Sequence, residues 1–194
     1  MLLGMAGTCF AYSRQRKVEI FGTTQLIEME LKPDTPNYEF CSAAKLNVAD
    51  ISATGFGLGY NLDDHWNVNA SLLQGSTGTT HEKNYDKNGL FLDAKLRYLF
   101  VGANLEYNFL KKRLSPFVTA GGGLAKISGK RDRCQHGRYV TVIDDVMYSY
   151  NVGAGLRWDL AEHIALKLTY RRTFFEGKSS GDADFVGINL AYMW

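Results

Sequence analysis

The chain has 194 residues, of which 45% are hydrophobic and 22% charged, with 20 glycines and 3 prolines. This composition excludes a disordered or collagen-like chain and predicts one folded domain. The 22 basic and 20 acidic residues give a formal net charge of +2. This is too small an excess of positive charge to indicate nucleic-acid binding, so no nucleic-acid partner is expected. No segment beyond the N-terminus approaches the roughly 20 apolar residues of a membrane-spanning helix, whereas the strands of a transmembrane barrel would escape such a search.

Residues 1–16 are predicted to be the remnant of a signal peptide and an N-terminal arm. Residues 1–12 are apolar and rich in small side chains, and a basic run at 14–17 follows them. The small residues Cys9 and Ala11 would permit cleavage after Ala11. The alternative is a short cytosolic or disordered N-terminus.

Cleavage after Ala11 would leave two cysteines, Cys41 and Cys134. In an oxidising compartment this pair can form one disulfide between two long connections. Two unpaired thiols are an equally open alternative.

Strand-like alternation fills the rest of the chain. In the last segment one face carries large apolar side chains, namely Val186, Ile188, Leu190, Tyr192 and Trp194. The same split recurs at 145–158 and 164–174, where Arg157, Lys167 and Arg171 lie on the face opposite the bulky apolar residues. Alternation alone does not distinguish a membrane barrel from a soluble sandwich.

The connections between the strands favour the barrel. Residues 57–68 align position for position with residues 155–166, as two copies of one hairpin with a short turn. A third short connection spans 110–115, and long polar connections alternate with these turns, at about 32–47, 77–88, 129–144 and 176–183. Short turns, long loops and aromatic residues near the short turns are typical of outer-membrane barrels. The aromatic residues expected at the membrane interface are Tyr60, Trp66, Tyr107, Phe109, Phe117, Trp158, Tyr192 and Trp194.

The predicted fold is all-β, an eight-stranded antiparallel up-and-down transmembrane β-barrel over residues 17–194. Its strands are expected near 17–31, 48–61, 65–76, 90–109, 116–128, 145–158, 164–174 and 184–194. The apolar face changes parity within 90–109, so a bulge near Leu99–Val101 is predicted to keep that face outward. A similar change between Leu26 and Ile27 leaves the register of the first strand open.

Three segments carry a resemblance to a known group of proteins. Residues 55–60, 115–123 and 151–158 resemble strands of the small bacterial outer-membrane barrels of the OmpA-like and OmpX/Ail-like families, through glycine and aromatic patterning. The resemblance covers nearly the whole chain after residue 17. It implies the bacterial outer membrane as location, with outer-membrane lipid and lipopolysaccharide as surroundings. The last strand resembles the signal read by the barrel-assembly machinery, with Trp194 in place of the usual Phe and Asn189 where glycine is often found.

No pattern of catalytic, cofactor-binding or metal-ligating residues is present, so the protein is expected not to be an enzyme. His65 and His163 occupy equivalent places in the two copied turns, which indicates a role in the turns. His81 and His136 lie in different long connections, without a set of ligands at metal spacing. No nucleophile motif and no phosphate-binding loop occurs.

A barrel of about eight strands has an interior wide enough only for side chains. We therefore predict a filled lumen without a wide pore. Glu106 faces this interior, as do Arg157, Lys167 and Arg171, and buried charges need partners. These four residues are predicted to form an ion network centred on Glu106.

The third long connection, 129–144, carries the basic residues Lys130, Arg131, Arg133 and Arg138. Arginine binds phosphate with two parallel hydrogen bonds, so this loop is predicted to bind anionic glycans, either the cell's own lipopolysaccharide or a host polysaccharide. A solvated polar loop without a ligand is the alternative.

The predicted function is a non-enzymatic outer-membrane barrel whose long extracellular loops serve surface interaction, adhesion or envelope integrity. The alternatives are an OmpW-like passage for small hydrophobic molecules, a lipid A-modifying barrel enzyme and a soluble lipocalin-type carrier. The charges expected in the lumen argue against the hydrophobic passage.

Overall fold

A computed structural model describes residues 13–32, 46–76, 80–82, 92–132, 139–178 and 180–194. The strands within these residues are β1 (Val18–Lys32), β2 (Leu46–Asn61), β3 (Trp66–Ser76), β4 (Thr80–Glu82), β5 (Leu92–Asn108), β6 (Leu114–Asp132), β7 (Tyr139–Ala161), β8 (Ile164–Glu176) and β9 (Ser180–Met193). In this described part of the chain, no helix is long and apolar enough to cross a membrane.

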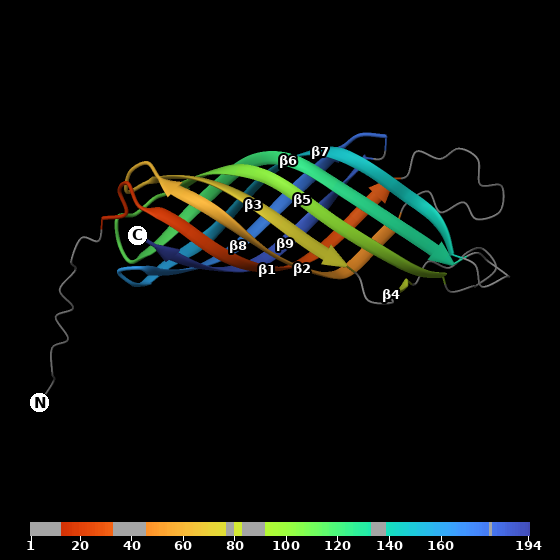
Figure 1. Cartoon of the computed structure of the whole chain (residues 1–194), viewed down its shortest axis with the longest axis horizontal. Coiled ribbons are helices and arrows are strands. Elements are labelled where there is room, and N and C mark those ends of the chain that lie inside the picture. The colour runs from red at the N-terminus through yellow and green to blue at the C-terminus, as the bar shows by residue number, and fades with distance from the viewer. Residues whose placement is uncertain (1–12, 33–45, 77–79, 83–91, 133–138, 179) are drawn as a thin grey trace, which may run out of the picture.

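The strands close into one antiparallel barrel (Figure 1). β1 pairs with both β2 and β9, and β3 pairs with β5, which leaves no open edge between the first and last strands. The short β4 continues the line of β3 along β5, because Ser76 lies opposite Arg97 and Thr80 opposite Ala94. The barrel therefore has eight strand positions, and the predicted fold is confirmed.

The ends of the barrel differ in their connections. Turns at 62–65, 109–113 and 162–163 lie at the same end as the start of β1 and the C-terminus (Figure 1). At the other end β6 and β7 extend further than predicted, and Lys130 pairs with Thr141 and Arg131 with Val140. Much of the segment expected as a loop at 129–144 is thus strand, because the two strands keep their backbone pairing beyond the apolar belt.

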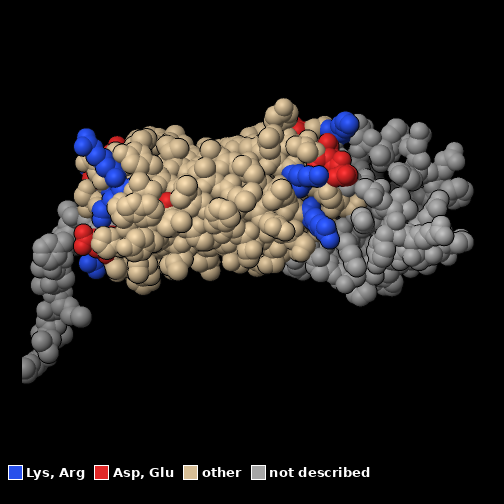
Figure 2. Space-filling view, viewed as in Figure 1, with Lys and Arg blue, Asp and Glu red and all other residues tan. Residues whose placement is uncertain are grey.

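The outer wall between the two ends is apolar. Outward side chains such as Phe56, Tyr148 and Ile188 are 61%, 72% and 55% exposed. Figure 2 shows charged side chains gathered at the two ends, with a broad band between them that carries almost none. A continuous apolar belt of this kind is the surface that a transmembrane barrel presents to lipid.

The lumen is filled by two different sets of side chains. Toward the short turns lies the charged half, formed by the buried residues Arg14, Glu19, Asn61, Asn67, Asn104, Glu106, Asn108, Ser115, Arg157, Asp159 and Lys167. Toward the long connections lies the apolar half, formed by Ile27, Met29, Ile51, Ala53, Leu73, Leu96, Tyr98, Phe100, Ala125, Ile127, Met147, Phe175, Ala183 and Phe185.

The apolar half explains why the predicted bulge in the fourth strand is wrong. β5 pairs with β3 and with β6 without any shift of register. Tyr98 and Phe100 point inward and are 1% exposed, while Leu99 and Val101 face outward at 40% and 55%. Both faces of this stretch are apolar because one contacts lipid and the other fills the lumen.

The first strand, β1, is likewise apolar on both faces where its inner face fills the lumen. Leu26 faces outward, and Ile27 and Met29 are buried in the lumen without a break in the pairing of β1 with β9. The irregularity lies opposite, because Ile27 pairs with Ile51 and Met29 with Val48 of β2. Three steps of β2 thus match two steps of β1, which is the count of a β-bulge.

Phe117 also differs from its predicted place at the membrane interface. It is 2% exposed and lies inside the barrel. A Cβ atom on its cross-strand partner Gly155 would lie 2.4 Å from the Phe117 ring, so only glycine permits this packing. The equivalent position in the copied hairpin, Gly57, has the same relation to Phe21, at 2.3 Å. Each glycine makes room for an inward aromatic ring of the neighbouring strand.

Candidate functional site: the charged lumen and the outer rim

The two copied turns each end in a histidine that holds the next strand. The Nδ1 atom of His65 lies 2.7 Å from the Asn108 carbonyl oxygen, and that of His163 lies 2.8 Å from the Met193 carbonyl oxygen. Each Nδ1 therefore donates, because a carbonyl oxygen only accepts. The rings stack on Tyr107 and on Tyr192. This geometry gives both histidines a structural role in the turns.

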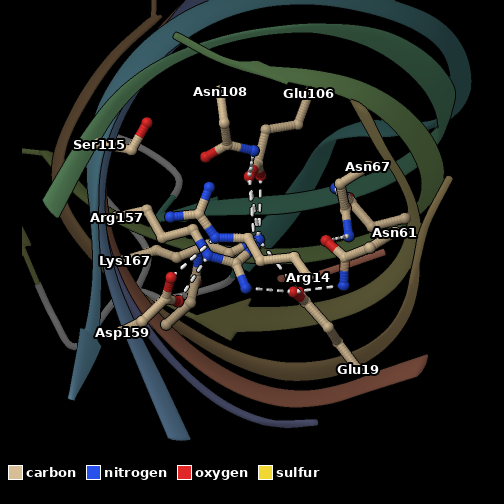
Figure 3. Close-up of polar contacts among 12 residues, drawn as sticks. Arg14, Glu19, Asn61, Asn67, Glu106, Asn108, Ser115, Arg157, Asp159 and Lys167 are labelled. Atoms are coloured by element: carbon tan, nitrogen blue, oxygen red, sulfur yellow. Dashed lines mark hydrogen bonds and ion pairs between the residues drawn. The ribbon is translucent and has the colours of Figure 1, made fainter. Parts of the chain in front are cut away.

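The charged half is organised around Glu19 of β1 (Figure 3). One carboxylate oxygen of Glu19 lies 2.6 Å from an Arg157 nitrogen and accepts a hydrogen bond of 2.9 Å from Asn61. Its other oxygen accepts a hydrogen bond of 3.1 Å from Lys167. Glu19 is completely buried, so both of its cations are bound away from bulk water.

Glu106 of β5 joins the same network from the opposite wall. Lys167 Nζ lies 3.0 Å from Glu106 Oε2, and the Asn108 amide donates to Glu106 Oε1 at 3.0 Å. The nearest Arg157 nitrogen is farther from Glu106, at 3.9 Å. Lys167 therefore bridges two carboxylates, one from each side of the lumen.

Arg14 closes this half of the lumen at the short turns. Its Nε atom donates to Asp159 Oδ2 at 2.7 Å, and Asp159 also accepts a hydrogen bond of 2.9 Å from Arg157. The Arg14 guanidinium donates to the carbonyl oxygens of Asp64 and Leu110, at 3.3 and 3.2 Å, and to that of Lys112. One buried side chain thus ties the N-terminal arm to two of the short turns, 62–65 and 109–113, and to Asp159 of β7.

Three of the four residues predicted for the ion network meet in the structure, namely Glu106, Arg157 and Lys167. Arg171 lies apart from them, so its assignment to the network is wrong: its guanidinium donates to Gln25 at 3.2 Å and lies over the Phe185 ring at 4.8 Å. Arg171 lies next to the apolar half because it is four residues farther along β8 than Lys167.

Three residues of the charged half, Glu19, Asp159 and Arg14, were not predicted from the sequence. Glu19 shares the inward parity of Thr23 and Gln25, and Asp159 that of Arg157, so alternation alone would have placed both in the lumen. Arg14 gave no such signal, because it precedes the first strand.

A groove of about 1090 Å³ crosses the outer wall beside the long connections. Its floor follows the register of four strands. One row across them contains Ser52, Ser76, Arg97 and Ser128, and the next contains Thr54, Gln74, Leu99 and Lys126. The third row, with Phe56, Leu72, Val101 and Leu124, is apolar and belongs to the belt. The groove therefore lies at the outer edge of the lipid-facing surface.

Two cations stand in this groove without a carboxylate partner among the described residues. Arg97 and Lys126 are both exposed, and neither forms an ion pair within this part of the chain. The nearest outward-facing acid in the register of β6 and β7 is Asp144, which accepts a hydrogen bond of 2.9 Å from Ser128. The groove thus offers two free positive charges among hydroxyl and amide groups.

The remaining predicted residues fall into two groups. Lys130 and Arg131 belong to β6, four and five residues beyond Lys126, whereas Arg133 and Arg138 lie outside the described residues, as do Cys41 and Cys134.

The other aromatic residues expected at the interface face outward, with Phe109, Trp158, Tyr192 and Trp194 each more than half exposed. Among the described residues, no group of three or more His, Cys, Asp or Glu side chains could hold a metal ion.

Comparison with known proteins places the chain in a family. Residues 18–193 match the model of the outer membrane protein beta-barrel domain. No curated protein sequence matches the chain. Among solved structures, Neisserial surface protein A is 12% identical with a TM-score of 0.57, covering 90% of this chain and 96% of its own. Ail of Yersinia pestis is 13% identical with a TM-score of 0.57, covering 92% and 99%.

A third structure, OprG from Pseudomonas aeruginosa, is 13% identical with a TM-score of 0.53, covering 93% of this chain and 96% of its own. At these identities the structures share the fold with this chain. Together with the family match and the apolar belt, they establish that the chain belongs to the outer membrane protein beta-barrel domain family and is a small β-barrel protein of the bacterial outer membrane.

Proposed function

We propose that this barrel is a non-enzymatic surface protein that binds phosphorylated or sulfated sugars at its outer rim. The observation that carries the proposal is the groove across β2, β3, β5 and β6, in which Arg97 and Lys126 have no carboxylate partner among the described residues. Cations left unpaired in a polar groove are available to an anionic ligand.

The chemistry of the groove suits such a ligand. The planar guanidinium of Arg97 can bind a phosphate or sulfate group with two hydrogen bonds, and the Lys126 ammonium adds a point charge. Ser76 and Gln74 on the neighbouring strand supply hydroxyl and amide groups for sugar oxygens. Adjacent strands are about 4.8 Å apart, so the row from β2 to β6 spans roughly 14 Å, which matches a ligand of two or three sugar units.

The position of the groove also supports the proposal. It lies directly beyond the apolar belt, on the side of the long connections, where the phosphorylated sugars of lipopolysaccharide meet the protein. β6 continues from Lys126 to Lys130 and Arg131, two of the four basic residues that the sequence predicts to bind anionic glycans. Ail of Yersinia pestis has been solved in complex with the heparin analogue sucrose octasulfate, which is a precedent for a sulfated sugar on this fold.

A passage for small hydrophobic molecules is less well supported. The apolar half of the lumen would suit such molecules, but Tyr98, Phe100 and Phe185 fill it, with each ring buried to 1% exposure. The groove outside is lined mainly by polar side chains. We therefore place the interaction on the rim.

The test compares two double variants of the refolded protein in detergent. In R97S/K126S the two groove cations are lost, and in K112S/R113S two exposed cations at the opposite end are lost. Retention on immobilised heparin and on immobilised lipopolysaccharide is measured with increasing sodium chloride. We expect the wild type and K112S/R113S to elute together, and R97S/K126S to elute at lower salt.

A second variant, R131S/R133S/R138S, separates the predicted loop from the groove. If only this triple variant loses retention, the loop carries the binding and the groove does not. Wild-type protein that passes through both columns at low salt would overturn the proposed function. Heat-modifiable migration in gels verifies that every variant has folded.

A further inference from the structure

The charges inside the barrel do not balance. The buried charged side chains of the described residues comprise four cations, Arg14, Arg157, Lys167 and Arg171, and three carboxylates, Glu19, Glu106 and Asp159. Arg14 pairs with Asp159, Arg157 pairs with Asp159 and Glu19, and Lys167 pairs with Glu19 and Glu106. Arg171 is the cation that has no carboxylate among them.

Arg171 is held by weak neutral contacts. One terminal nitrogen donates to the Gln25 amide oxygen at 3.2 Å, and the guanidinium lies 4.8 Å from the Phe185 ring centre and 5.6 Å from that of Phe100. Its Nε atom has no hydrogen-bond partner among the described residues, although the side chain is only 7% exposed. Arginine does not lose its proton in proteins, so it cannot escape the cost of burial by becoming neutral.

Arg171 faces a small chamber between the charged half and the apolar half. The chamber has a volume of about 50 Å³, and a single water needs roughly 10–15 Å³ by the same kind of measure, so it has room for a few water-sized species. Lys167 and Arg171 both line it, against one carboxylate, that of Glu106. The hydroxyl groups of Thr23 and Thr169 also line it and can donate hydrogen bonds.

We propose that this chamber binds one small monovalent anion, a halide such as chloride, with Arg171 as its principal ligand. The anion would balance the buried charges of the described residues, because four buried cations would then face three buried carboxylates and one halide. A chamber with room for only a few water-sized species excludes large organic anions such as gluconate. The site is distinct from the groove on the outer wall and does not depend on the proposed binding of sugars.

The geometry also determines how the anion enters. Arg14 closes the lumen at the short turns, and the apolar half closes it on the other side. We therefore expect capture during folding and slow exchange afterwards. An experiment must set the anion before the barrel closes.

The first test refolds the protein into detergent in sodium chloride or in sodium gluconate of equal ionic strength. Wild-type protein should have a Tm several degrees higher in chloride, because gluconate is too large for the chamber. The variant R171M should show no difference between the two salts, and in gluconate it should melt above the wild type because the unpaired buried cation is gone. K112M, at an exposed turn position, should keep the wild-type chloride effect. An equal chloride effect in R171M would overturn the proposal.

The second test does not require a variant to fold. Wild-type protein refolded and crystallised in sodium bromide should show an anomalous scattering peak in the chamber, within hydrogen-bonding distance of Arg171. Protein refolded in gluconate and transferred to bromide only after folding should show a weaker peak, because the lumen is closed. A chamber without a bromide peak after refolding in bromide would refute the anion site.

Discussion

Toward the short turns the inward positions of the barrel carry Glu19, Arg157 and Lys167, whereas toward the long connections the same strands turn Ile27, Met147 and Phe175 inward. β1 pairs with β9 without a shift of register through both halves, so the difference between the halves lies in the side chains that fill the lumen. The charged half depends on specific partners, because each charge is buried and must be paired. The apolar half depends on volume, because its side chains must fill the space without leaving a cavity.

The largest effect is expected where one partner is removed from the charged half. Glu19→Leu leaves Arg157 and Lys167 buried with one carboxylate fewer each, and should lower the free energy of unfolding by about 3–5 kcal/mol. Urea titration in detergent, followed by circular dichroism, measures the loss. Glu28→Leu is the matched control, because Glu28 faces outward on the same strand. Equal losses in both variants would show that Glu19 does not organise the lumen.

A smaller loss of stability is expected when Glu106 is replaced. Comparing it with the loss at Glu19 ranks the two carboxylates of the charged half. Glu106→Leu should cost about 2–3 kcal/mol, because Lys167 keeps Glu19 as a partner and Arg157 keeps Glu19 and Asp159. Leu105→Ala, at the neighbouring lipid-facing position, should cost less, since lipid chains fill the space and no cavity forms. The same urea titration compares them. A larger loss for Leu105→Ala would contradict a lumen held by its ion pairs.

The apolar half should respond to a single methyl group. Ile127→Val removes a methyl from a completely buried side chain, and we expect a loss of about 0.5–1.5 kcal/mol. Ile188→Val makes the same change on the lipid face, where Ile188 is 55% exposed, and should cost less. If both changes cost the same, the apolar half would not be a packed core.

These two halves also explain what the sequence could and could not predict. The positions of the strands and their number, eight, follow from alternation and turn spacing, because lipid requires an apolar outer face everywhere. Alternation fails at Tyr98 and Phe100, where the inner face is apolar too, and it therefore predicts a bulge that the register does not contain. Glu19 has the right parity for the lumen, but no sequence rule pairs it with Arg157 across the barrel. Arg14 binds three carbonyl groups of two turns, and carbonyl positions are a product of the fold.

The smallest effect is expected at Asp64, which lies outside the membrane and whose carboxylate binds the N-terminal arm at Ser13 and Arg14. The Asp64 carboxylate accepts hydrogen bonds from the Arg14 backbone N–H at 2.9 Å and the Ser13 hydroxyl at 3.1 Å, and it lies 3.4 Å from Lys111 Nζ. Burial alone would raise the pKa of Asp64, but these hydrogen bonds and the Lys111 charge outweigh it and hold the pKa below the ordinary value of 3.8. A lowered pKa means that this contact stabilises the fold fully above the ordinary pKa and is lost as the pH falls through the lowered value.

The N-terminal arm should therefore stay docked at neutral pH and loosen only in acid. Nuclear magnetic resonance of the protein in detergent can follow the Arg14 amide between pH 7 and pH 2. Its chemical shift should titrate with a midpoint below 3.8, and the titration should vanish in Asp64→Asn. The Trp66 amide provides an internal control, because it reports on Asp63, whose carboxylate accepts hydrogen bonds from the Trp66 and His65 backbone N–H groups, which lower its pKa. An Arg14 midpoint at or above 3.8 would show that Asp64 does not hold the arm. Arg14 would then depend on Asp159 and the turn carbonyls alone to close the lumen.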